Sequence, residues 1–188
     1  MEQRFPGWGR WRYAVGTAGC LVLGWFAFVR GTRVPLLGLV DLGFHELGHL
    51  LTYPFPDVIT AMMGSMTQVA VPLGVALYFL LLRKDRLAGG LCLAWTATSA
   101  QDASVYIADA PTQSLPLLGD GIHDWAFVLG RWHAIDRAGA IAAGVKVFGV
   151  AMLFTGFAIC VWNLLQEEPP AHEQWWQDSP TPVDWTSR

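Results

Sequence analysis

The feature that most constrains the fold of this chain is a series of five apolar segments. Each is long enough for the roughly 17–25 residues that a membrane-spanning helix needs. The segments cover about Tyr13–Val29, Val34–Tyr53, Ile59–Leu82, Leu87–Ala108 and Ala138–Leu165. Hydrophobic residues make up 53% of the 188 residues and charged residues only 14%, against about 25% in soluble domains. The sequence therefore predicts an all-α membrane protein with about five transmembrane helices.

Two further stretches complete the expected organisation. Residues His123–Arg137 form a short amphipathic segment before the fifth apolar segment. The end of the chain contains four prolines and three tryptophans after position 168 and has no helical or strand period. We therefore expect a helical membrane domain over residues 1–165 and a disordered tail, rich in Trp and Pro, over residues 166–188.

Within the second apolar segment, His45-Glu46-Leu47-Gly48-His49 has the spacing of a zinc motif. Residues four apart lie on one face of a helix, so both imidazoles can bind one zinc ion. The glutamate between them can then act as general base on a water that the metal activates. Ionisable groups are costly in hydrocarbon, and three of them in an apolar segment indicate a functional site rather than a chance match. We expect His45 and His49 to be metal ligands and Glu46 to be the catalytic base.

A catalytic zinc site usually has three protein ligands and one open position. The best distal candidates are His123 and Asp124, because both side chains can bind zinc and both lie at the start of the amphipathic segment. Adjacent helical residues point about 100° apart, so one of the pair would face the metal and its neighbour would have another role. Asp120 is a third possibility. The alternative is that this cluster only caps a helix, a role in which an aspartate needs no metal.

Other polar residues in the apolar segments have less specific roles. Asp41 lies on the same helical face as the two histidines, but ligands from three consecutive turns would extend about 12 Å along the axis. We expect Asp41 to support the ligands, to face the substrate or to lie near the membrane surface, rather than to bind the metal. Asp102, Tyr106 and Asp109 share a face of the fourth segment, and we expect them to line a water path to the metal, to support its ligands or to form hydrogen bonds between helices. Gln68 is expected to pack beside the motif helix or to hold a substrate backbone.

The zinc motif and its apolar setting resemble intramembrane zinc metalloproteases of the site-2 protease type. In that family an H-E-x-x-H on a membrane helix and a distal Asp on a later helix bind zinc, and residues 45–49 match the first motif. The family's distal motif is Asp-Gly preceded by Leu, often with Asn-Pro upstream. This chain has Leu-Gly-Asp-Gly at residues 118–121 and no Asn-Pro there. The resemblance implies a zinc peptidase and leaves the third ligand open.

A second resemblance covers roughly residues 41–130 and is to a group of small bacterial membrane proteins. They share H-E-x-G-H, Gly-Ser…Gln…Pro, Tyr-Ile-Ala-Asp-Ala, Leu-Pro-Leu-Leu and His-Asp-Trp. These motifs correspond here to His45–His49, Gly64–Pro72, Tyr106–Ala110, Leu115–Leu118 and His123–Trp125. This resemblance favours the His123-Asp124 pair over Asp120 and implies the inner membrane of a bacterium. It implies no substrate.

Together these features predict a membrane-embedded, zinc-dependent hydrolase that cleaves a peptide bond in a membrane protein or peptide, with Zn²⁺ as cofactor and the lipid bilayer as surroundings. Three alternatives stay open. The chain could hydrolyse a lipid or another amide, bind zinc without catalysis, or be a structural membrane protein with a chance motif. The net charge of −3 argues against a nucleic-acid partner.

Overall fold

The computed structural model describes residues 8–116 and 122–166, and all regular secondary structure in these ranges is helical. The helices are α1 (Trp8–Gly24), η1 (Trp25–Val29), α2 (Leu37–Thr52), α3 (Asp57–Leu77), η2 (Tyr78–Arg83), α4 (Arg86–Asp109), α5 (Asp124–Arg131), η3 (Ile135–Arg137) and α6 (Ala138–Leu165). The π-helices η1 and η2 continue α1 and α3, and η3 is a 3₁₀ turn before α6. The prediction of an all-α protein is confirmed. The predicted tail, beyond Gln166, and Asp120 lie outside the described residues.

Three helical segments among the described residues are long and apolar enough to cross a membrane, fewer than the five predicted. They are Arg10–Val29, Asp57–Arg83 and Ile135–Leu165. The helix α2 has 16 residues, about 24 Å at 1.5 Å per residue, which is less than the roughly 30 Å of bilayer hydrocarbon. The helix α4 is longer, with 24 residues, but buried polar side chains in its second half lower its hydropathy.

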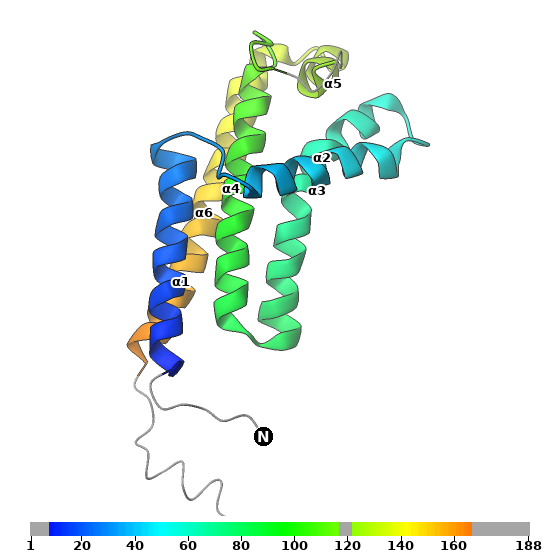
Figure 1. Ribbon diagram of the computed structural model, residues 1–188. Helices are drawn as coiled ribbons and strands as arrows, with labels where there is room; N and C mark the ends of the chain where they lie inside the picture. Colours follow the sequence, from blue (N-terminus) through cyan, green and yellow to red (C-terminus); the bar gives the residue numbers. More distant parts are fainter. Residues whose placement is uncertain (1–7, 117–121, 167–188) are drawn as a thin grey trace, which may run out of the picture.

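The long helices form a bundle in which α4 packs against α6, α3 and α1 (Figure 1). The start of α1 and the end of α6 lie at the same end of the bundle, where Arg10 Nε donates a hydrogen bond of 3.2 Å to the carbonyl of Leu164. At this end Arg86 also donates to Asn163 Oδ1 at 3.1 Å. The helix α5 lies at the opposite end (Figure 1).

Small residues let α4 and α6 approach closely. A Cβ atom on Gly90 of α4 would lie 3.0 Å from the carbonyl oxygen of Gly156 on α6. One on Gly149 would lie 3.1 Å from the carbonyl oxygen of Ala97. Membrane helices commonly associate through such contacts, because van der Waals packing replaces the hydrophobic driving force that lipid does not supply.

The helix α2 runs across the bundle rather than along it (Figure 1). Its buried residues Gly38, Asp41, His45 and Gly48 lie on one face, which is small and polar. Asp41 accepts hydrogen bonds from Trp95 Nε1 at 2.7 Å and from a serine hydroxyl of α4 at 2.9 Å. Asp41 therefore connects α2 to α4 and lies, as expected, outside the set of metal ligands.

Candidate metal centre

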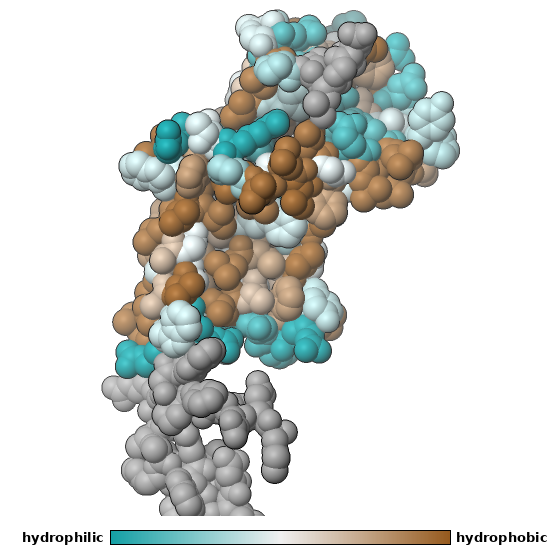
Figure 2. All heavy atoms as spheres, viewed as in Figure 1, coloured by the Kyte–Doolittle hydropathy of each residue, from teal (hydrophilic) through white to brown (hydrophobic). Residues whose placement is uncertain are grey.

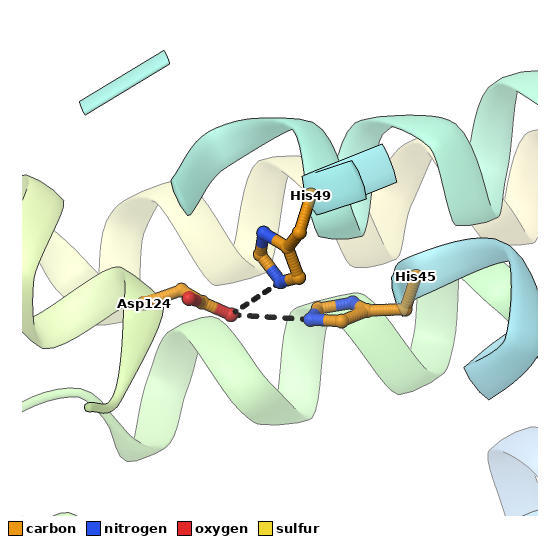
Figure 3. A group of neighbouring side chains, drawn as sticks. All are labelled: His45, His49 and Asp124. Carbon is orange, nitrogen blue, oxygen red and sulfur yellow. Dashed lines mark hydrogen bonds and ion pairs between the residues drawn. The ribbon is translucent and has the colours of Figure 1, made fainter. Parts of the chain in front are cut away.

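Two histidines of α2 and one aspartate of α5 point toward a common centre (Figure 3). The Nε2 atoms of His45 and His49 lie 3.1 Å and 3.3 Å from Oδ2 of Asp124. All three candidate ligand atoms lie within 4.8 Å of one another, and no other group of this kind occurs in residues 8–116 and 122–166. The one-turn spacing of the histidines stacks their side chains on the same face of α2. The structure thus brings together the predicted ligands His45, His49 and Asp124.

These separations fit a metal ion. Metal–ligand bonds of about 2.0–2.1 Å at tetrahedral angles place neighbouring ligand atoms about 3.3–3.4 Å apart. The two nitrogen–oxygen distances, 3.1 Å and 3.3 Å, are close to that value. The group could therefore hold a metal ion.

The opposite ring nitrogens of both histidines are held by hydrogen-bond acceptors. Nδ1 of His45 donates to Gln68 Oε1 at 3.3 Å, and Nδ1 of His49 donates to the carbonyl oxygen of Thr60 at 2.8 Å. A neutral imidazole that donates from Nδ1 presents the lone pair of Nε2. Such partners orient a metal-binding histidine and increase its basicity. Gln68, for which the sequence suggested packing or substrate contact, thus orients a candidate ligand.

The space beside the two imidazoles is kept open by Gly64 of α3. A Cβ atom at this position would lie 2.7 Å from Nε2 of His45 and 2.6 Å from Nε2 of His49. Real Cβ atoms do not approach other atoms this closely. Any larger residue at position 64 would therefore occupy the side of the centre that faces α3.

Asp124 is ionised in this setting. Burial acts to raise the pKa of its carboxyl, but hydrogen bonds and electrostatic interactions with His45 and His49 lower it to about 2. The group is therefore suited to a cation at its centre, either protons on the rings or a metal ion.

His123 does not join the metal group, and it caps α5 instead. Its Nδ1 accepts a hydrogen bond of 3.3 Å from the backbone N–H of Ala126, and its Nε2 lies 3.4 Å from Oδ2 of Asp109. The ring is almost completely buried and stacks on Tyr106. Of the adjacent pair His123 and Asp124, one thus faces the centre and the other supports the helix start. The two side chains diverge because His123 is the N-cap residue with an extended backbone, whereas Asp124 is the first helical residue of α5.

A cavity of about 1030 Å³ opens onto the centre. Besides the three candidate ligands, its lining includes Glu46, Arg33, Asp57, Asp102 and Tyr106. Glu46 is exposed in this cavity, one residue after His45 on α2. Oδ2 of Asp102 lies 3.6 Å from Nε of Arg33, so this carboxylate of α4 faces the cavity. The arrangement places an exposed carboxylate and a metal-binding group in one water-accessible space.

No protein-family model, curated protein or solved structure matches this chain.

Sequence reasoning named Gln68 and Tyr106 near the site but did not identify which ligand each one contacts. The carbonyl of Thr60 gives no signal in a sequence, since any residue has a carbonyl. The close approach of Gly64 to the two imidazoles is evident only after the helices are placed. The signal for Tyr106 is its place, with Asp102 and Asp109, on one face of a helix that precedes the His123-Asp124 pair in the chain.

Proposed function

We propose that this protein is a membrane-embedded, zinc-dependent hydrolase that cleaves a peptide bond, with His45, His49 and Asp124 as zinc ligands and Glu46 as general base. The observation that carries the proposal is the convergence of the three ligand atoms, at 3.1 Å and 3.3 Å, in the cavity that also contains Glu46. A bound zinc ion would supply Lewis-acid polarisation of a carbonyl and make a water acidic near pH 7.

The donor set alone would also suit a non-haem iron site, since two histidines and one carboxylate with open positions are typical of Fe(II) oxygenases. Glu46 favours zinc hydrolysis over iron chemistry. It lies on the motif helix and is exposed to the cavity, where a general base for water is needed. Imidazole and carboxylate are both ordinary zinc ligands.

In the proposed reaction Glu46 removes a proton from the attacking water and delivers it to the leaving amine. The cavity provides room for an extended peptide beside α2. Asp124 and the two imidazoles would hold the zinc ion in a fixed position. Hydrolysis of a lipid or of another amide would use the same residues, so the substrate class is decided by assay with reconstituted membranes.

The outer face of α2 favours a position within lipid. Val40, Leu47 and Leu51 form an apolar stripe on the outer surface of α2, away from Glu46, and are 46%, 37% and 64% exposed. A helix in a soluble protein has the reverse pattern, with its apolar face buried. Hydrophobic side chains cover the middle of the visible face, including the region of α2, with hydrophilic side chains beyond both ends (Figure 2). We infer that α2 lies in the bilayer near the end of the bundle that carries α5.

This placement predicts how fast single introduced cysteines react with a water-soluble maleimide in leaky vesicles. Leu51→Cys should react much more slowly than Ser114→Cys, because the first lies in lipid and the second in an exposed loop after α4. Both should react in denaturing detergent. The wild-type chain, in which Cys20 and Cys160 are buried and Cys92 is half-buried, gives the background. Equal rates for the two variants would place the outer face of α2 in water.

The proposed function is tested by elemental analysis of the purified chain after incubation with zinc. We expect about one zinc per chain in the wild type, and loss of stoichiometric zinc in His45→Ala and in Asp124→Ala. His133→Ala should keep the metal, because His133 lies outside the ligand group. A folded wild type that retains no zinc, or an Asp124→Ala variant that retains it all, would contradict the proposal.

A further inference from the structure

We propose that Tyr106 is a positioning residue, whose hydroxyl holds Asp124 in the orientation that metal binding requires. The inference rests on the proposed metal centre. It assigns a role to a side chain of α4 that the zinc motif does not include.

The hydroxyl of Tyr106 contacts Asp124 at two points. It donates a hydrogen bond of 3.2 Å to Oδ2 and accepts one of 3.0 Å from the backbone N–H of the same residue. Oδ2 is the oxygen that faces both histidines. Asp124 is also the first residue of α5, and N–H groups in the first turn of a helix have no partner within it. A single hydroxyl thus fixes both the backbone and the carboxylate of the third ligand.

Tyr106 is itself fixed by its neighbours. Its ring stacks on that of His123, with centroids 4.2 Å apart and an interplanar angle of 27°. Its other neighbour is His45, whose ring lies edge-on at 5.8 Å. His123 is held by its capping hydrogen bond to Ala126 and by its approach to Asp109. The buried histidine of the His-Asp pair therefore supports the tyrosine that orients the aspartate.

Removal of the hydroxyl should weaken metal binding while the fold persists. Without this contact the side chain of Asp124 can rotate about its two side-chain bonds. Metal binding must then order this ligand, which lowers the affinity for the metal. Loss of a group that orients a metal ligand typically weakens metal binding about 10–100-fold. We expect this loss for Tyr106→Phe, which retains the ring and both ring contacts.

The experiment titrates the metal-free full chain in detergent with Co²⁺ and records the visible absorption of the bound ion. Tyr106→Phe should bind Co²⁺ about 10–100-fold more weakly than the wild type and show an altered spectrum at saturation, because the carboxylate is no longer held. Tyr106→Met, which also lacks the hydroxyl, carries the same expectation and replaces Tyr106→Phe if that variant does not fold.

The matched control is Ser65→Ala, which removes the hydrogen bond of 3.0 Å from Trp125 Nε1 and so loosens the attachment of α5 to α3. If Ser65→Ala weakens Co²⁺ binding as much as Tyr106→Phe does, the effect comes from general docking of α5 and the inference is wrong. Unchanged affinity and spectrum in Tyr106→Phe would also overturn it and would leave the metal centre standing. A wild type that binds no metal would instead remove the proposed function itself.

Discussion

Replacing Glu46 with glutamine should leave about one zinc per chain and lower the rate of peptide hydrolysis by about 10²–10⁴-fold. The separation of the two effects follows from the geometry. Glu46 is exposed in the cavity and is not one of the three converging ligands, so its charge is not required to hold the ion. A general base, by contrast, contributes only to the step in which water loses its proton.

Asp57→Asn is the matched control for this variant. Asp57 is another exposed carboxylate that lines the same cavity, in the first turn of α3, and its replacement also removes one negative charge. We expect it to keep both zinc and activity. The measurement is the initial rate on a peptide substrate in reconstituted membranes, together with the zinc content of each sample. Equal rates for Glu46→Gln and the wild type would exclude Glu46 as the base and would favour a metal-binding protein without catalysis.

The positions of the helices were accessible from the sequence, because hydrophobic length and the prolines after Tyr53 mark them clearly. The number of membrane-spanning helices could not be predicted from the sequence. The apolar composition of α2 predicted a membrane-spanning helix, because an apolar segment has the same composition whether it spans the bilayer or runs across a helix bundle. Its 16 helical residues, and the burial of its polar rather than its apolar face, became evident only in three dimensions.

The candidate site was predictable to a similar degree. His45 and His49 followed from spacing alone, and the distal ligand could be narrowed to Asp120, His123 or Asp124. The selection of Asp124 required the direction of the α5 start, which depends on the hydroxyl of Tyr106 and on the cap formed by His123. Such contacts join segments that lie apart in the chain, so no local pattern encodes them.

The strictest test of the space around the proposed ion is Gly64→Ala. The added methyl would lie 2.6–2.7 Å from the Nε2 atoms of both histidines, well inside contact distance. Both rings must turn away from the added methyl. Loss of one orienting contact typically weakens metal binding about 10–100-fold, so we expect zinc affinity to fall by at least this factor. The fold should persist, since the atoms that must move are the ends of side chains lining an open cavity.

Two glycines provide the comparison for Gly64→Ala. Gly74→Ala, on the same helix, adds a methyl with no atom within 4 Å, so zinc binding should stay at the wild-type level. Gly48→Ala would instead push against the backbone of Met63, where α2 and α3 meet, and should lower the thermal stability of the metal-free chain. Zinc titration and thermal unfolding of the three variants separate a blocked site from a disrupted helix pair. Wild-type zinc affinity in Gly64→Ala would mean that the ion, if bound, does not lie between these imidazoles, and the ligand assignment would have to be abandoned.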